Sequence, residues 1–471
     1  MRTGLTYNDV LLIPKRTPLK SRKEACIKSR FTKNIPLNIP LVSSNMATVT
    51  EHKMAIAMAR AGGLGIIHQF CSLDEQVAEV QKVKKSTSYV IEDPKKIQDF
   101  QTLKEAKDLM FLSDISSLLV MCGDELVGIL TYRDYLFQDE EKRISELMTK
   151  KEDLITAPKG ITLEEAKNIL HQNRIEKLPL LENGKLSGLI TTTDVEILEK
   201  WPNSNRDSKG RLRVGAAVGV KDTIERVRAL VNAEVDVIVL DVAHAHSDFV
   251  IQRLKEIKEN FNIDVMVGNI ATKEAAFDLI QAGADGLKVG IGPSPVCTTR
   301  IMSGSGIPQL TAIMDVVEIA NKFNIPVTAD GGAKYPGDLA KAIAAGASSI
   351  YSGTLFAGTD EAPGRIILKN GKRYKRYMGS ASYDSNHERK ERIERKLHKD
   401  KINVFVEGVA VLVDFKGSVE GVIESMVKGI RSGISYCGAR NIKDMQENSE
   451  FIQITPSGWT ESGSRGEKLS E

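Results

Sequence analysis

The chain has 471 residues, 41% of them hydrophobic, and is therefore long enough for two or more domains with full-sized cores. Its 65 basic and 62 acidic residues leave a net charge of +3, which argues against a nucleic-acid-binding protein with a basic face. Five widely spaced cysteines contain no C-x-x-C pair, which disfavours a zinc site or a disulfide framework.

The N-terminal segment lacks the apolar core of a signal peptide, and no apolar run approaches the length of a membrane span. We therefore expect a cytoplasmic protein with reduced thiols. Two apolar runs come next in the chain, IPLVSSN (39–45) and GLGIIHQF (63–70), and each is typical of a short buried strand.

Two similar segments follow, GDELVGILTYRD from Gly123 and NGKLSGLITTTD from Asn183. Each comes after a helical pattern and a short apolar strand, and a unit that occurs only twice indicates a pseudo-symmetric pair. The pair resembles tandem cystathionine-β-synthase (CBS) motifs, whose Thr and Asp often hold a nucleotide ribose. The resemblance implies a regulatory nucleotide at Thr131, Asp134, Thr191 and Asp194. The alternative is that these residues only cap two helices.

Six more apolar runs come after the repeat, and most are followed by an amphipathic helical pattern such as KEAAFDLIQAG. They are RVGAAVG (213–219), VDVIVLD (235–241), DVMVGNI (264–270), GLKVGIG (286–292), IPVTADGG (325–332) and SSIYSGTLFAG (348–358). Near-continuous apolar strands are typical of a parallel sheet that is buried on both faces. Eight of them in alternation with helices predict an α/β fold, a (β/α)8 TIM barrel with an inserted tandem CBS domain. An open, doubly wound sheet is the alternative.

Polar, turn-rich stretches at 84–93 and 201–211 indicate the boundaries of the inserted domain. We therefore assign residues 1–84 to the first part of the barrel and residues 85–204 to the CBS pair. Residues 205–471 form the rest of the barrel, with a flap at about 378–407.

The stretch GIGPSPVCTTR (290–300) follows the sixth predicted strand and contains Cys297. In such a barrel, the loops at the carboxyl ends of the strands carry the chemistry. Its glycines let the backbone approach a ligand closely, and Thr298 and Thr299 supply hydroxyls beside the thiol. This context predicts a nucleophilic cysteine, whereas the alternative is a small buried hydrophobic residue.

The last two strands end in ADGG and SGT, which indicates a nucleotide-binding end of the barrel. Loops after strands seven and eight of these barrels often hold a phosphate on backbone amides. Asp330 can accept hydrogen bonds from both hydroxyls of a ribose. The alternative is that the glycines only make ordinary turns.

The segments VGIGPSPVCTTR, ADGG and GTLFAGTDEAPG, together with the inserted repeat, resemble the IMP dehydrogenase / GMP reductase family across nearly the whole chain. In that family a cysteine attacks C2 of a purine nucleotide to form a covalent thioimidate, and a nicotinamide cofactor takes or gives a hydride at that carbon. The resemblance also implies a homo-oligomer, either a tetramer through the barrels or an octamer.

The resemblance assigns roles residue by residue. It implies Cys297 as the nucleophile, with Thr299 and Glu361 handling the leaving ammonia. Substrate contacts are expected at Asp330, Gly331, Gly332, Gly353, Thr354, Met378, Gly379, Ser380 and Glu407, the last on the purine base. Cofactor contacts are expected at Asp241, Asn269 and Gly290. A monovalent cation such as K⁺ is expected at Gly290, Gly292 and Cys297.

The direction of hydride transfer depends on the flap. Dehydrogenases of the family activate water with an Arg-Tyr pair, but the flap arginines here, Arg389, Arg392 and Arg395, precede Lys390, Ile393 and Lys396. This charged run is typical of a solvated helix. The missing pair, the segment MGSAS and the late segment TPSGW favour GMP reductase with NADPH. The alternative is IMP dehydrogenase with NAD⁺.

Two residues depart from the family pattern in the cysteine loop. Pro295 has neither a hydroxyl nor an N–H, so a phosphate or ribose contact at that position is lost. Ser294 replaces a glycine of the cation-binding turn. These departures leave open a third possibility, a nucleotide-binding regulator without turnover.

Overall fold

The computed structural model describes residues 1–86, 90–91, 93–113, 115–394 and 405–463. The chain divides into two compact units. The first comprises Met1–Ser86, Asn203–Asp207 and Leu212–Glu471, and the second comprises Thr87–Pro202 and Ser208–Arg211. None of the described helices combines the length and the apolar character that crossing a membrane requires.

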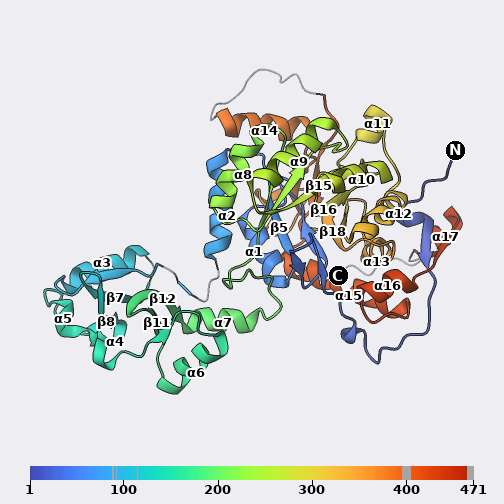
Figure 1. Ribbon diagram of the computed structural model, residues 1–471. Coiled ribbons are helices and arrows are strands. Elements are labelled where there is room, and N and C mark those ends of the chain that lie inside the picture. The colour runs from blue at the N-terminus through green and yellow to red at the C-terminus, as the bar shows by residue number, and fades with distance from the viewer. Residues whose placement is uncertain (87–89, 92, 114, 395–404, 464–471) are drawn as a thin grey trace. The chain divides into compact units, whose positions relative to one another are not determined.

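The first unit contains a closed barrel of eight parallel strands (Figure 1). In chain order they are β4 (Leu41–Ser43), β5 (Leu64–Ile67), β13 (Gly215–Val218), β14 (Val237–Asp241), β15 (Asp264–Ile270), β16 (Gly286–Val289), β17 (Val327–Asp330) and β18 (Ser349–Ser352). Each lies within one of the eight predicted runs, so the barrel prediction is confirmed and the open sheet is wrong. The strands are almost entirely buried, because the barrel interior and the surrounding helices cover both faces.

Helices follow the strands and pack their apolar faces on the barrel. They are α1 (His52–Ala61), α2 (Leu73–Lys85), α8 (Thr223–Asn232), α9 (Asp248–Asn260), α10 (Lys273–Gln281), α12 (Gln309–Ala320), α13 (Pro336–Ala344) and α15 (Val419–Tyr436). Local sequence sets where they begin. Ser72 and Glu75 form a capping box at the start of α2, and Pro336 occupies the first turn of α13, where no N–H is needed.

Smaller elements complete the first unit. The helical ones are α11 (Thr299–Ser303), α14 (Tyr383–Glu394), α16 (Ile442–Asn448), α17 (Pro456–Glu461) and the 3₁₀ turns η1 (Tyr7–Asp9), η2 (Arg22–Glu24) and η4 (Asn321–Phe323). The strands are β1 (Val10–Leu12), β2 (Ser29–Arg30), β3 (Pro36–Leu37), β19 (Ile367–Lys369), β20 (Lys372–Met378), β21 (Ala410–Asp414) and β22 (Phe451–Gln453). β20 pairs antiparallel with β21, which joins the two sides of the predicted flap.

The second unit contains two similar halves. The first half has β6 (Lys96–Gln98), α3 (Leu103–Ser113), β7 (Ser117–Cys122), β8 (Glu125–Thr131), α4 (Tyr132–Tyr135), α5 (Ile144–Leu147), β9 (Thr149–Lys150) and η3 (Lys151–Asp153). The second half has β10 (Ala157–Pro158), α6 (Leu163–Asn173), β11 (Lys177–Glu182), β12 (Lys185–Thr191) and α7 (Thr192–Lys200).

The hairpins of the two halves carry the same irregularity. The register shifts between Val120 and Met121 in one hairpin and between Leu180 and Leu181 in the other. The sequence repeat is therefore also a structural repeat, and its assignment to the CBS family stays a prediction.

Candidate active site

A cavity of about 560 Å³ lies at the carboxyl ends of the barrel strands, which is the size of a small-molecule site. It brings together residues from most barrel strands and from both sides of the flap. The predicted site residues that line it are Asp241, Asn269, Gly290, Gly292, Cys297, Thr299, Asp330, Gly331, Gly353, Thr354, Gly379, Ser380 and Glu407.

Cys297 lies beside a hydroxyl and a carboxylate. Its Sγ is 3.2 Å from Thr299 Oγ1, and Thr299 Oγ1 donates a hydrogen bond to Glu407 Oε2 at 2.8 Å. Because the hydroxyl gives its one proton to Glu407, the thiol is the donor toward Thr299. The three groups can therefore pass a proton from sulfur to carboxylate.

Backbone pairing brings Glu407 to the cysteine loop. The N–H of Thr298 donates to the Glu407 carbonyl at 2.8 Å, and the N–H of Val409 donates to the Val296 carbonyl at 3.0 Å. Cys297 and Gly408 form an antiparallel bridge between these bonds. A short two-stranded contact thus fixes the thiol and the carboxylate on neighbouring chain segments.

The Arg300 guanidinium stabilises the cysteine loop through hydrogen bonds to backbone carbonyls. Its Nε donates to the Ile291 carbonyl at 2.9 Å, and its Nη2 donates to the Ile307 carbonyl at 2.7 Å. A Cβ added to Gly292 would lie 2.5 Å from Arg300 Cγ, and one on Gly306 would lie 2.8 Å from it. Both glycines also have positive φ, so the loop requires glycine at these positions.

The assignment of Glu361 as a catalytic acid is wrong. Its Oε2 accepts a hydrogen bond from the Val419 N–H at 2.8 Å, and its Oε1 accepts one from the Ser418 hydroxyl at 3.1 Å. The carboxylate therefore caps the N-terminus of α15, a position that favours negative charge. It is not among the residues that line the cavity, and Glu407 occupies the place beside Thr299 instead.

Two expected substrate contacts also lie outside the cavity lining. The Met378 side chain is buried, and the Met378 N–H donates to Thr48 Oγ1 at 3.1 Å. Gly332 has φ of +83°, and a Cβ there would lie 3.3 Å from Pro293 Cβ. These residues shape the loops next to the site and do not face into it.

Sequence reasoning missed a group of residues around Gly353. A Cβ on Gly353 would lie 2.6 Å from Met46 Sδ, 2.6 Å from Tyr377 Oη and 2.8 Å from Ser44 Oγ. The Ser44 hydroxyl is buried and has no hydrogen-bond partner among the described residues, which suits a polar ligand in the cavity. Burial raises the pKa of Tyr377, so its phenol stays a donor. Ser44 follows a strand end and was detectable, whereas Tyr377 on β20 carries no such signal.

Lys288 was also missed, because it lies inside the predicted strand 286–292. Its ammonium contacts Asp241 Oδ1 at 2.7 Å and Asp330 Oδ2 at 2.8 Å, and it donates a hydrogen bond to the side-chain oxygen Oδ1 of Asn269. The expected cofactor and ribose residues are therefore linked through one buried cation.

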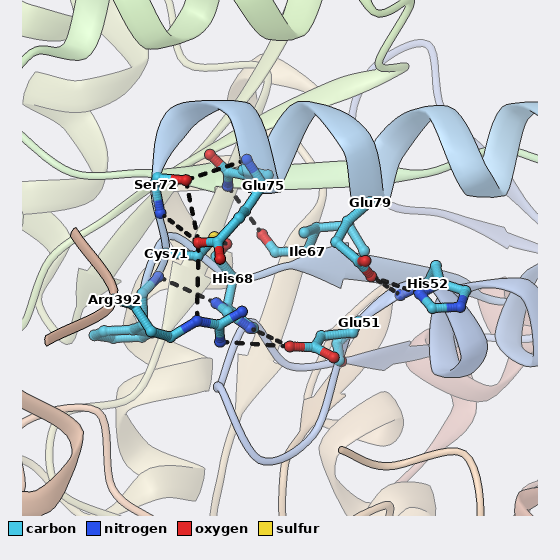
Figure 2. A network of polar contacts seen from close by, with 12 residues as sticks. Glu51, His52, Ile67, His68, Cys71, Ser72, Glu75, Glu79 and Arg392 are labelled. Carbon is cyan, nitrogen blue, oxygen red and sulfur yellow. Dashed lines mark hydrogen bonds and ion pairs between the residues drawn. The ribbon is translucent and has the colours of Figure 1, made fainter. Parts of the chain in front are cut away.

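The flap helix α14 packs against the loop after β5. Arg389 lies over the Phe70 ring, 5.8 Å from its centroid, and both residues line the cavity. Figure 2 shows the Arg392 guanidinium between two carboxylates, 3.5 Å from Glu51 and 3.9 Å from Glu75. The expectation of a solvated helix is therefore wrong for this face, because its described arginines dock on the barrel.

Glu51 connects this docking contact to the buried His68 (Figure 2). The Phe70 N–H donates to His68 Nδ1, so Nε2 carries the ring proton and faces Glu51 at 3.4 Å. Burial raises the pKa of Glu51, but its contacts with His68 and Arg392 outweigh this effect and the net pKa is lowered. Glu51 is thus an anion at neutral pH and can hold the flap helix.

Of the three residues expected to hold a monovalent cation, Gly290, Gly292 and Cys297, the first uses its carbonyl within the protein, as does the neighbouring Ile291. The Gly290 carbonyl accepts a hydrogen bond from Asn269 Nδ2 at 2.6 Å. The Ile291 carbonyl accepts one from Arg300. A monovalent cation at Gly292 and Cys297 stays a prediction.

In the second unit, Thr131 and Asp134 form a helix cap. Asp134 Oδ2 accepts hydrogen bonds from the Thr131 N–H and hydroxyl, each at 2.7 Å, and Oδ1 accepts one from Thr149 at 3.3 Å. Thr191 is buried, and the side chain of Asp194 lies outside the described part of the chain. Thr131 and Asp134 thus form the capping box of α4, and nucleotide binding at this pair stays a prediction.

Comparisons with known proteins agree on one family. The sequence model described as "IMP dehydrogenase / GMP reductase domain" matches residues 4–465. The inosine-5'-monophosphate dehydrogenase of Nitrosopumilus maritimus is 47% identical over 467 residues, which cover 98% of both chains. The GMP reductase of Leishmania donovani is 46% identical over 475 residues, which cover 98% of this chain and 96% of that one.

Solved structures resemble the whole chain as well. A GMP reductase variant from Trypanosoma brucei, crystallised with guanosine 5'-monophosphate, has a TM-score of 0.91 and 42% identity and covers 99% of both chains. The structure of GMP reductase from the same organism with guanosine 5'-triphosphate has a TM-score of 0.79 and 38% identity, and covers 97% of this chain and 98% of that one.

Proposed function

The chain belongs to the IMP dehydrogenase / GMP reductase family of purine-nucleotide oxidoreductases, and we propose that it catalyses reductive deamination of GMP to IMP and ammonia with NADPH. The arrangement of Cys297, Thr299 and Glu407 supports covalent chemistry at a purine carbon. A dehydrogenase reaction would use the same three residues, so they do not determine the direction of hydride transfer.

The first half of the reaction exchanges the amine for sulfur. The Cys297 sulfur forms a bond to C2 of GMP, and its proton passes through Thr299 to Glu407. The same proton then returns through Thr299 to the amine, the C2–N bond breaks, and ammonia leaves a thioimidate on the enzyme.

The second half exchanges sulfur for hydrogen. A bound NADPH would supply the hydride to C2 and would itself be oxidised to NADP⁺. The C2–S bond breaks with its electron pair on sulfur, and the thiol regains a proton from solvent. The sum is GMP, NADPH and one proton giving IMP, ammonia and NADP⁺, with water attacking at no step.

The pocket residues fit both ligands. The buried Ser44 hydroxyl has no partner among the described residues and can donate a hydrogen bond to the mononucleotide. Asp330 can accept hydrogen bonds from its ribose hydroxyls. A nicotinamide needs an acceptor for its carboxamide N–H groups and a flat surface for its ring. Asp241 and Phe70 offer these in the same cavity.

The contacts of the flap arginines are the observation that supports the reductase direction. Arg389 stacks on Phe70 and Arg392 pairs with Glu51, so both serve to dock α14. Neither is followed by tyrosine, and Arg395 with Lys396 lies outside the described residues. Hydrolysis of the thioimidate requires an activated water, whereas reductive deamination does not.

IMP dehydrogenase with NAD⁺ is the second candidate, because relatives of that name are equally similar. The Aquifex aeolicus enzyme of that name is 48% identical over 470 residues. Overall identity therefore does not separate the two reactions.

Two assays on the purified chain decide between them. The absorbance of the dihydronicotinamide is followed with GMP and NADPH, and then with IMP and NAD⁺. We expect NADPH consumption that requires GMP. Formation of NADH with IMP would establish the dehydrogenase instead, and no change in either mixture would leave a nucleotide-binding regulator.

A further inference from the structure

Lys288 is the most deeply buried cation of the cavity lining, with 1% of its surface exposed. It lies on β16, and its ammonium is between Asp241 at the end of β14 and Asp330 at the end of β17. The face of the Tyr351 ring lies 5.1 Å from the same ammonium. A cation is rarely placed so deeply unless its partners require it.

The two aspartates are held by further contacts. Asp241 Oδ2 accepts a hydrogen bond from Asn45 Nδ2 at 2.8 Å, and the Tyr351 hydroxyl donates to Asn45 Oδ1 at 2.6 Å. Asp330 Oδ2 accepts a second hydrogen bond from Asn269 Nδ2 at 2.9 Å. Side chains from six of the eight strands or strand ends thus form one network around Lys288.

The charges of this network show what Lys288 supplies. Burial by itself lowers the pKa of Lys288, but Asp241 and Asp330 outweigh it and the net pKa is raised. The ammonium therefore stays charged and offsets one of two carboxylates at the floor of the pocket. Without it, two anions would share a site with little solvent.

Both carboxylates are also partly exposed to the cavity, 17% for Asp241 and 21% for Asp330. Each has one oxygen on Lys288 and remains accessible to a ligand. The lysine thus contacts the aspartates from the buried side, while the ligand approaches from the open side.

We propose that Lys288 is a positioning residue for the mononucleotide, which acts by holding the Asp330 carboxylate in its orientation toward the ribose and by tying it to Asp241. This inference rests on one part of the proposed function, the binding of a purine mononucleotide at Asp330. It does not depend on the direction of hydride transfer.

A double-mutant cycle on GMP binding tests the proposal. The dissociation constant is measured by calorimetry, without cofactor, for the native chain, Lys288→Met, Asp330→Asn and the double variant. We expect each single variant to weaken binding by about tenfold or more. If Lys288 acts through Asp330, the double variant binds no more weakly than Asp330→Asn alone. If the loss of GMP affinity in the double variant equals the product of the two single losses, the proposal is overturned.

Lys84→Met is the matched control. Lys84 is also buried, 5% exposed, and lies between two aspartates, Asp207 at 3.0 Å and Asp236 at 2.6 Å, but does not line the cavity. Its loss should lower the melting temperature and leave the GMP dissociation constant within about twofold. An equal loss of GMP affinity in Lys84→Met would show that any broken buried ion pair has this effect, and would also overturn the proposal.

Two further outcomes are distinguishable. If Lys288→Met does not fold, Lys288→Gln completes the cycle, since the amide keeps a donor and removes the charge. If the native chain binds neither GMP nor IMP, the proposed function fails. If it binds either one and the cycle is additive, only the role of Lys288 fails.

Discussion

The hydroxyl of Thr299 donates a hydrogen bond at 2.8 Å to the carboxylate of Glu407, a residue 108 positions later in the chain. The same hydroxyl lies 3.2 Å from the thiol of Cys297. Because the hydroxyl lies between the two, the proposed transfer of a proton from sulfur to carboxylate requires both Thr299 and Glu407.

We therefore expect Glu407→Gln and Thr299→Val to lower turnover by about a hundredfold or more, the usual contribution of a positioned acid or base. Nucleotide affinity should change little, because the proton moves only during the chemical steps. Steady-state rates and calorimetric binding measure the two effects separately. Equal losses in both would indicate that these residues only bind substrate.

Glu361→Gln is the control for that prediction, since Glu361 caps α15. We expect a cost of about 1 kcal/mol in the free energy of unfolding and little change in turnover. Denaturant unfolding and the rate assay check both values. A Glu361→Gln protein that folds but has no turnover would show that Glu361 takes part in catalysis.

Cys297→Ala should abolish turnover and keep nucleotide binding, because the proposed mechanism requires its thiol to form the covalent bond. An alkylating reagent should label Cys297, which is half-buried in the cavity, and a bound nucleotide should protect it. Cys71 should stay unlabelled, since burial raises the pKa of its thiol to about 12. Peptide mapping by mass spectrometry measures the labelling of Cys297, its protection by nucleotide and the absence of label on Cys71. Turnover by Cys297→Ala would rule out the covalent route.

Glu51→Gln should loosen the flap helix, because Glu51 pairs with Arg392 of α14. Hydrogen exchange at the α14 amides should speed up, and turnover should fall several-fold. Glu79→Gln is the control, since Glu79 pairs with His52 and Lys82 and not with α14. Equal exchange in the two variants would contradict the docking role.

The same contact has a defined dependence on pH. The pKa of Glu51 is lowered from 4.5, so its stabilising contribution is complete above that value. As pH falls through the lowered pKa, Glu51 is protonated and the contribution is lost. The protection factors of the α14 amides, which correct for the slower intrinsic exchange in acid, should therefore decrease below pH 4.5 in the native chain and not in Glu51→Gln.

In the second unit, Asp134→Ala tests the expected nucleotide site. GTP is a suitable probe, because a related GMP reductase was crystallised with it. We expect Asp134→Ala to lose GTP binding, whereas Glu165→Ala, which removes a comparable capping box at Thr162, keeps it. Calorimetry on the full chain measures both. Equal binding by the two variants would leave Asp134 as a helix cap only.

Much of the fold was predictable because the barrel is built from local patterns. Each of the eight runs is apolar enough to be buried on both faces, and the order of strands and helices allows few topologies. Cys297, Asp330 and Gly353 were also predictable, since they follow strand ends that must meet at one rim.

The sequence by itself thus determined the barrel, the structural repeat and the position of the thiol. Only the tertiary structure decided which glutamate faces that thiol, because Glu361 and Glu407 are chemically identical and differ only in the backbone segments beside them. The same holds for Lys288, whose place in an apolar strand gives no sign of two aspartates from other strands. Hydrophobic periodicity is a local property, whereas the pairing of polar side chains depends on contacts between distant segments.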